Sequence, residues 1–592
     1  MFYFVTEILL CIVFLLIPKS KEKQNFFIWI PVTVITYYCY TIFMAGVLSI
    51  LHISACVVSI GVINVLLSIA GIVYLRKKSD KQCYFIDVWD AVFLFVYIAL
   101  IVYVFDSRFT GDLRIIFETS DPGTHLKLAM NFVNQKSVSG MYAGSVINGL
   151  FVDAMSWKFS GAYIYKSFII NCGINYFLSG LMFYAATIGF VKKDWQKLVV
   201  YITTIIYVMG YPLNDLLYGF VYLQITITII SYLFFVVKIY MMDKTINPLY
   251  ARFFMSLGCL AVGVGYSLFA PLVFVVLLLC ITYNFWKEKK LFGKYFFSKQ
   301  YIVHSLQVFL MPTVFVLWFM ILYPNIFGSG ATNFGSAINM EGAIYRNLYS
   351  DFIIYILFAL YGMITAFKKR DILFHHVLLP GGILYTLFFA FRMFHGKVST
   401  YYYYKLNYLL WMIILVSFVE GIIILLEREF VLIMTYVMLV ACVFTLYITN
   451  FEEKSQEKNV NTIPFCVASN FYRVNYFNSI IRQNKTEINQ ELVKISDLVC
   501  QKYKTDTSYD TEQTTIIIGN WMYLYWYEAL INQRMSQLVN RSVEQNVNEF
   551  QQGHYGEFMV ILKDSEEYMA NQGLLDSLNK VYEDEYAMIV QR

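Results

Sequence analysis

Four carboxylates occur within one polar stretch that follows an apolar run, and their type suits acid–base chemistry or metal binding. They are Asp106, Asp112, Glu118 and Asp121. A carboxylate beside apolar walls can be tuned as a general base, and grouped acids can bind a divalent cation. We select Asp121 as the general base that removes the proton of an acceptor hydroxyl. Asp112, Glu118 and Asp106 are second choices, or ligands for Mg²⁺ or Mn²⁺.

The residues after Asp121 predict a helix. Asp121 and Pro122 are typical of a helix start, so capping is the alternative role for this carboxylate. His125, one turn further on, is a candidate substrate contact, although a solvated histidine is the plainer interpretation. Apolar residues then recur at helical spacing and predict an amphipathic helix lying on the membrane surface, at Leu126, Ala129, Met130 and Val133.

A second group is basic and lies in the segment 391–408. Arginine and lysine bind phosphate through charge-assisted hydrogen bonds and neutralise the charge of a departing phosphate. The alternative is that these side chains reach lipid head groups beside an ordinary belt of tyrosines. The proposed phosphate contacts are Arg392, His395, Lys397 and Lys405, with Tyr403 and, from the long loop 323–351, Arg346 as further substrate contacts. We expect that loop to act as a lid.

The elements that must position these residues are membrane spans. Of the 592 residues, 59% are apolar and 14% are charged, against about 25% charged in soluble domains. About fourteen apolar runs are long enough to be predicted as transmembrane helices. They lie near 2–17, 26–48, 53–75, 88–105, 163–190, 197–210, 218–238, 253–266, 269–286, 305–322, 352–367, 375–391, 406–424 and 430–448.

The distribution of lysine and arginine predicts the orientation. Loops rich in these residues alternate along the chain with loops that are poor in them, and rich loops face the cytoplasm. Both termini are then predicted to be outside the cytoplasm, with membrane lipids as partners. Basic residues placed this way report topology, so we expect no nucleic-acid partner. The outer loops are 106–162, 323–351 and 392–405, which contain all the candidate residues.

The chain divides into a transmembrane part, 1–450, and a tail, 451–592, predicted to be a small soluble α/β domain. The segments 514–520 and 557–564 have the apolar character of buried strands. Helices are expected at 491–503, 521–535 and 565–582. The fold class is therefore an all-α polytopic membrane protein with a small extracytoplasmic α/β domain.

The stretch Ser120-Asp-Pro-Gly-Thr-His-Leu-Lys-Leu-Ala129 resembles a motif of the GT-C superfamily of glycosyltransferases, with Pro122 in place of the motif's second acid. The layout of an acidic first outer loop, an interfacial helix and a soluble outer tail is similar too. This resemblance implies a GT-C-like fold and a sugar donor linked to polyprenyl phosphate. It also implies that Asp121 is the base and that basic residues of a later outer loop meet the carrier phosphate.

We therefore expect a glycosyltransferase of the cell membrane, from a bacterial source by composition, that moves a sugar onto an extracytoplasmic cell-surface glycan. One alternative is a polysaccharide polymerase or O-antigen-ligase-like enzyme, which would use the basic cluster at 392–405. The non-enzyme alternative is a flippase or transporter for lipid-linked saccharides. A transporter predicts ionisable residues near the membrane midplane and inverted repeats, and the spans show neither clearly.

Overall fold

The computed structural model describes most of the chain. The described residues are 2–17, 20, 22–77, 81–111, 113, 121–155, 161–242, 247–289, 298–322, 338–342, 344–346, 350–427, 466–471, 473–474, 488–503, 513–533 and 541–592.

Within these ranges, ten helices are long and apolar enough to cross a membrane. Thirteen of the predicted spans fall on described residues, and helices occupy all of them. The ten are α2 (Phe26–Ile50), α3 (Val57–Lys77), α4 (Val88–Phe109), α7 (Gly161–Ile188), α10 (Val221–Met242), α12 (Ala270–Lys289), α13 (Lys299–Leu317, continued by η2, Trp318–Leu322), α16 (Ser350–Lys369), α17 (Phe374–Phe394) and α18 (Thr400–Leu426).

The four other predicted spans are not among these ten. Three of them are helices of 15, 13 and 16 residues, shorter than the roughly 20 residues that cross a bilayer. They are α1 (Phe2–Leu16), α8 (Lys197–Met209) and α11 (Pro248–Gly263). The expected break inside 253–286 is present, because α11 ends at Gly263 and α12 begins at Ala270. The run 430–448 lies outside the described residues.

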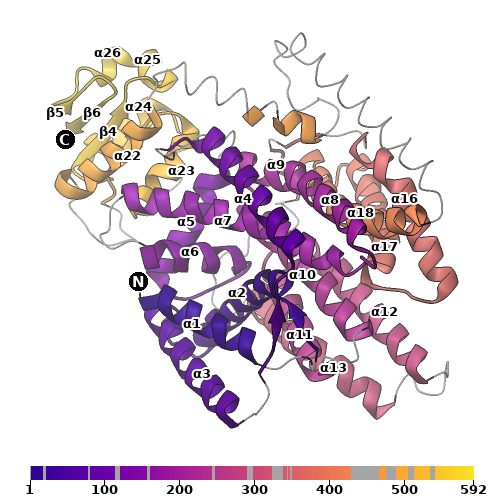
Figure 1. The fold of residues 1–592 in the computed structure, drawn as a ribbon. Coiled ribbons are helices and arrows are strands. Elements are labelled where there is room, and N and C mark those ends of the chain that lie inside the picture. The colour runs from indigo at the N-terminus through magenta and orange to yellow at the C-terminus, as the bar shows by residue number, and fades with distance from the viewer. Residues whose placement is uncertain are drawn as a thin grey trace.

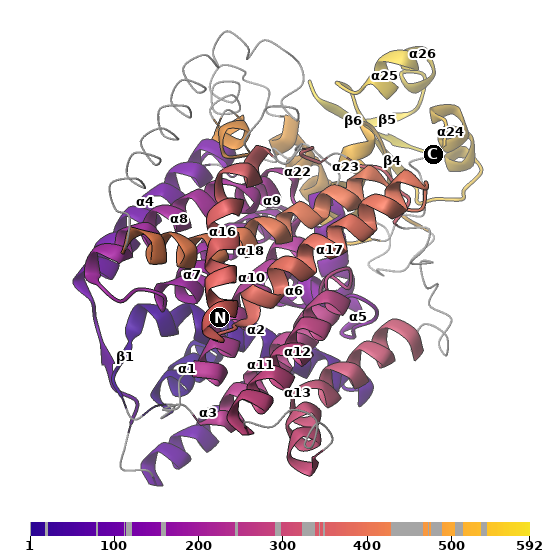
Figure 2. The ribbon, with the colours of Figure 1, turned by 90° about the vertical axis from the view of Figure 1, so that its right-hand side faces the viewer.

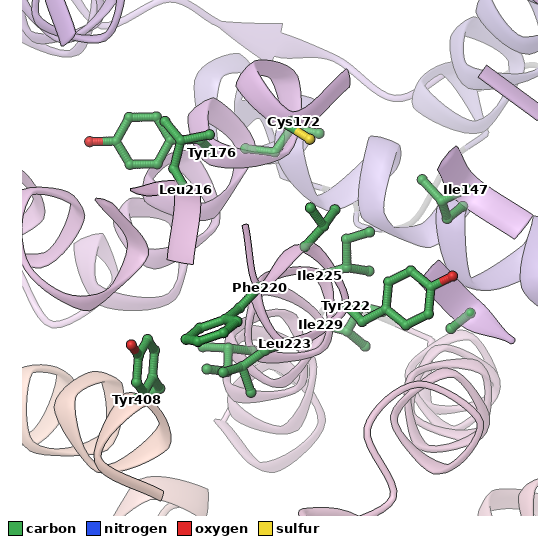
Figure 3. Packing of buried hydrophobic residues seen from close by; sticks show 14 of the residues in the cluster. Ile147, Cys172, Tyr176, Leu216, Phe220, Tyr222, Leu223, Ile225, Ile229 and Tyr408 are labelled. Carbon is green, nitrogen blue, oxygen red and sulfur yellow. The ribbon is translucent and has the colours of Figure 1, made fainter. Parts of the chain in front are cut away.

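The spans form an inner and an outer group (Figures 1 and 2). In α10 and α18 most of the hydrophobic window is buried by protein, 89% and 83%, whereas in α3 and α13 the share is 22%. Lipid-facing helices need only be apolar, while inner helices can carry polar side chains that protein must satisfy. Figure 3 shows the inner packing, where Phe220 lies between α10 and Tyr408 of α18, with ring centroids 5.9 Å apart.

Three helices that do not qualify as spans lie near the candidate residues: α5 (Asp121–Gln135), α6 (Ala143–Met155) and α9 (Tyr211–Tyr218). The helix predicted after Asp121 is confirmed as α5. Its apolar side does not rest on the membrane as predicted, because Leu126, Ala129 and Met130 are buried by protein, largely by α6. Amphipathic spacing alone does not distinguish a lipid surface from a protein surface.

The tail contains a four-stranded sheet in the order β3-β4-β6-β5, with β3 parallel to β4 and the other neighbours antiparallel. The predicted strands are confirmed as β3 (Ile516–Ile518) and β4 (Phe558–Leu562). The helix predicted at 565–582 is wrong, because turns at Asn571 and Asp576 end α25 (Glu566–Ala570) and α26 (Gln572–Leu575) before β5 (Lys580–Glu583). The remaining elements are α22 (Ile488–Leu498), η4 (Val499–Tyr503), α23 (Trp521–Leu530), α24 (Val543–Gln551), β6 (Ala587–Gln591) and, in the transmembrane part, β1 (Gln24–Asn25), β2 (Tyr84–Phe85) and η1 (Asp194–Gln196).

Candidate active site

Asp121 is the first residue of α5 and contacts the start of α18. The Tyr401 hydroxyl donates a hydrogen bond of 2.8 Å to Asp121 Oδ2. Tyr401 stands in the first turn of α18, whose N-cap Ser399 accepts from the Tyr402 amide. Two segments 280 residues apart in sequence therefore meet at one carboxylate. The bond fixes the direction in which the carboxylate points, which a catalytic base requires.

Lys405 lies one helical turn after Tyr401 and is buried at 7% exposure. Its ammonium is 4.0 Å from the Tyr401 ring centroid and 4.6 Å from that of Phe220, so aromatic faces surround it. Asp121 and Asp215 are the carboxylates that act on it electrostatically. In the described part of the chain, neither forms an ion pair with it. A buried ammonium held mainly by aromatic rings is suited to bind an anion.

The short helix α9 contributes a second buried carboxylate, Asp215, which interacts electrostatically with Lys405. Burial raises the pKa of Asp215 well above its ordinary value, and Lys405 opposes that rise. Its Oδ1 has no hydrogen-bond partner among the described residues. α9 ends at Gly219, whose φ of 75° suits glycine, and a Cβ there would come within 2.5 Å of Pro122. This close approach brings α9 against the start of α5.

His125 lies beside the same group. Its ring stands edge-on to Tyr222 of α10 at 4.2 Å between centroids, and its buried Nδ1 has no described hydrogen-bond partner. Burial lowers the pKa of His125 to about 4, with Lys405 adding to that effect and Asp121 opposing it. The imidazole is therefore neutral near pH 7 and can offer or accept one hydrogen bond to a ligand. These neighbouring side chains form one group, which we name the Asp121 pocket: Asp121, His125, Asp215, Tyr401 and Lys405.

Two tail residues, Asn470 and Arg473, form hydrogen bonds with α9 and with the residues just before it. Arg473 is buried and donates a hydrogen bond of 2.7 Å to the Tyr218 hydroxyl. Asn470 donates to the carbonyl oxygens of Met209 and Gly210, at 3.0 and 2.5 Å. These bonds hold α9, and with it Asp215, between the tail and α18.

The basic residues predicted to bind phosphate do not stay together. Lys405 is buried in the Asp121 pocket, whereas Arg392, His395 and Lys397 are exposed at the end of α17 and just beyond it. The His395 imidazole contacts its own helix, 2.8 Å from the Phe391 carbonyl oxygen. Tyr403 is buried, but it lies two residues from Tyr401 and so points to a different side of α18.

Arg346 has a positioning contact in the structure. Its Nη2 donates to the Gly342 carbonyl at 3.3 Å and lies 3.5 Å from Glu341 Oε2. Glu341 in turn accepts from the Thr400 amide at 2.8 Å. Partial burial would raise the pKa of Glu341, but hydrogen bonds from Thr400 and Tyr401 outweigh it and leave that pKa below its ordinary value. This part of the predicted lid is thus fastened to the first turn of α18.

The predicted metal ligands do not form a described site. Asp106 is exposed, and Asp112 and Glu118 lie outside the described residues. In the ranges that the structure describes, the cluster able to hold a metal ion is His375, His376 and Glu420, with ligand atoms within 4.8 Å of one another. It lies 15 residues beyond Lys405 along α18, roughly 22 Å at helical rise. For His376 the Leu373 amide already donates to Nδ1 at 2.9 Å, so Nε2 carries the proton and offers no lone pair.

Sequence reasoning missed Asp215 and the bond from Tyr401 to Asp121. Asp215 stands in a short segment that is mostly apolar. An ionisable residue in such a segment is itself an indication of function, and it could have been used to predict Asp215. Tyr401 belongs to a run of four tyrosines, which hides the one that faces the pocket. Only helical phase relative to Lys405 could have selected it.

The fold and pocket define a polytopic helical membrane protein with a buried acid–lysine site at one end of its bundle. No family model and no curated protein matches the chain. Its structure is similar to that of ArnT from Cupriavidus metallidurans bound to undecaprenyl phosphate, with 14% identity over 85% of this chain and 97% of that chain and a TM-score of 0.48. It is also similar to the Archaeoglobus fulgidus oligosaccharyltransferase tethered with an acceptor peptide, with 11% identity over 79% and 68% and a TM-score of 0.42.

Both of these proteins are GT-C glycosyltransferases, the superfamily that the sequence resembles. Because the identities and TM-scores are this low, the proposals below rest on the residues of the Asp121 pocket alone.

Proposed function

We propose that this chain is a membrane glycosyltransferase that moves a sugar from a polyprenyl-phosphate carrier to a hydroxyl of an extracytoplasmic glycan. The observation that carries the proposal is the buried Lys405 ammonium, which has aromatic neighbours and no described ion pair, beside the oriented carboxylate of Asp121. A desolvated cation of this kind is stabilised by an anionic ligand, and a carrier phosphate supplies one.

The proposed step uses both groups. Asp121 accepts the proton of the acceptor hydroxyl while that oxygen forms a bond to the anomeric carbon of the sugar. The bond from this carbon to the phosphate oxygen breaks, and its electron pair leaves with polyprenyl phosphate. Lys405 neutralises the charge that develops on the departing phosphate. The neutral imidazole of His125 and the Asp215 carboxyl supply hydrogen bonds for sugar or acceptor hydroxyls.

The location follows from the predicted orientation. If the lysine-rich loops face the cytoplasm, the residues of the Asp121 pocket lie toward the other side, where lipid-linked sugars meet cell-surface glycans. Arg392, His395 and Lys397 keep a secondary role in this proposal, as surface contacts for the carrier or for lipid head groups. Mg²⁺ or Mn²⁺ at Asp112 and Glu118 likewise stays a proposal.

The experiment supplies labelled polyprenyl-phosphate sugars and a membrane glycan extract to the purified protein and follows release of polyprenyl phosphate. Lys405→Met is compared with Lys397→Met, which removes an exposed lysine from the same face. We expect wild type to turn over, Lys405→Met to lose about 100-fold or more, and Lys397→Met to stay within about threefold. Equal losses of activity in the two variants would show that Lys405 is not the specific phosphate contact and would favour Arg392, His395 and Lys397. No turnover of any donor by wild type would favour the ligase or transporter alternatives.

A further inference from the structure

The helix α23 from the tail lies directly on α5, the helix that begins with Asp121 (Figure 1). Their contacts occur at three levels along α5. Near its start, Trp526 packs at Gly123. One turn further on, Lys127 pairs with Glu528. Near its end, Asn134 pairs with Asn532.

The first contact is a close packing. A Cβ placed on Gly123 would come within 3.1 Å of both the Trp526 ring and its backbone nitrogen. Trp526 is buried, and its ring stands edge-on to Tyr165 and Phe168 of α7, with centroids 5.7 and 6.1 Å away. The Trp526 side chain of the tail therefore packs between the first turn of α5 and α7 and fixes the distance between these two helices.

The other two contacts are polar and directional. Lys127 Nζ lies 2.8 Å from Glu528 Oε2, and the Glu528 side chain is 5% exposed. Asn134 and Asn532 exchange two hydrogen bonds, of 2.6 and 3.0 Å between amide nitrogen and oxygen. A buried charge that loses its partner is strongly destabilised, so these contacts resist sliding of α5 along its axis.

Sliding of α5 would displace the carboxylate at its first residue. Misplacement of a catalytic group by about 1 Å can cost about 100-fold in rate. We propose that α23 positions Asp121, with Trp526 and Glu528 as positioning residues, so that the tail is an integral part of the active site and not a detachable acceptor-binding module. The catalytic consequence rests on the proposed function, while the clamping of α5 does not.

The test compares Glu528→Gln with Glu583→Gln, which neutralises the half-exposed partner of Lys563 and Lys580, 2.9 and 3.3 Å away, elsewhere in the tail. Hydrogen exchange of the α5 amides and steady-state turnover are both measured in detergent. For Glu528→Gln we expect α5 exchange at least tenfold faster and kcat about 10- to 100-fold lower, with the donor KM within twofold. Glu583→Gln should change neither quantity.

A reversed pair, Lys127→Glu with Glu528→Lys, should restore both readouts toward wild type, which a general loss of stability would not do. Unchanged α5 exchange in Glu528→Gln would overturn the clamp. Faster exchange with unchanged kcat would overturn the positioning role. If wild type turns over no donor, the proposed function fails by itself, and the exchange measurement still decides whether α23 clamps α5.

Discussion

The helix α18 carries a polar cluster near each end, and the two clusters are built differently. Near its start, Tyr401 and Lys405 belong to the Asp121 pocket, in which His125 Nδ1 and Asp215 Oδ1 have no hydrogen-bond partner among the described residues. Near its end, Glu420 Oε2 is within hydrogen-bonding distance of the His375 and His376 rings, at 2.7 and 2.5 Å. We call this second group the Glu420 cluster.

This difference in hydrogen bonding distinguishes polar side chains that stabilise the helix bundle from polar side chains that can bind a ligand. In the Glu420 cluster a chain of bonds runs from the Leu373 amide through His376 to one carboxylate oxygen, so α17 and α18 are joined and the bonding capacity of His376 is used. The Asp121 pocket leaves buried capacity open, which costs free energy unless a ligand completes it. Other buried polar atoms of the described residues, such as Lys238 Nζ near Glu420, also lack a hydrogen-bond partner. We therefore propose the Asp121 pocket as the site because its open capacity lies beside a carboxylate that Tyr401 orients.

The largest expected effect on the comparison of the two clusters is a loss of folding stability in a variant of the Glu420 cluster. Glu420→Ala leaves two buried imidazoles without their acceptor, and each buried donor left unsatisfied costs about 1–3 kcal/mol. We expect a lower Tm in detergent, with kcat and donor KM of the folded fraction unchanged. A chelator should not alter the wild-type Tm. A fall in Tm on chelation would show that the cluster binds a metal ion, and a selective change in donor KM would break the comparison.

The second effect concerns pH. The pKa of His125 is near 4 when folded and 6.5 in its ordinary state. Between these values the unfolded chain binds a proton that the folded chain does not, so stability falls as pH falls. His125→Gln should remove up to about 3 kcal/mol of that loss between pH 6.5 and 4. The exposed His395→Gln is the control, and an equal change in both variants would show that the His125 site is not desolvated.

A smaller effect is expected for Tyr401→Phe, which removes the hydrogen bond to Asp121 and keeps the ring beneath Lys405. A carboxylate that this bond no longer orients is misplaced for catalysis, so we expect kcat to fall about 10- to 100-fold. Loss of the bond should also lower the free energy of unfolding by about 1.5–3 kcal/mol. The matched variant is Tyr403→Phe, on another side of the same helix, which should stay within about threefold. A larger loss of kcat for Tyr403→Phe than for Tyr401→Phe would support the sequence prediction that Tyr403 contacts the substrate.

Much of the fold could be predicted from the sequence, because hydropathy reflects a requirement that each span must meet by itself. The ends of α1 and α8 were also predicted to within one residue. Hydropathy alone could not show that apolar runs as short as these give helices below the length of a typical span. In the tail, β3 and β4 are continuous apolar runs. β5 exposes alternate residues and follows a helix-like stretch, so local pattern favoured a longer helix there.

Part of the candidate site could also be predicted from the sequence, and part could not. Asp121, His125 and Lys405 could be selected by residue type and by their position in loops that the sequence predicts to be on the outer side. That Lys405 joins Asp121 while Arg392 and Lys397 stay at the surface depends on how α18 is turned against α9 and α5. Such an arrangement is set by packing between segments hundreds of residues apart, which one sequence does not report.

The measurement that tests the central claim most directly is turnover of Asp121→Asn with the donor that wild type uses, beside Asp106→Asn, which alters an exposed acid at the end of α4. Removal of a general base should lower kcat about 100-fold or more while the Tm stays unchanged, and Asp106→Asn should retain wild-type turnover. Full activity of a folded Asp121→Asn would contradict the account and leave Asp121 with no role beyond opening α5.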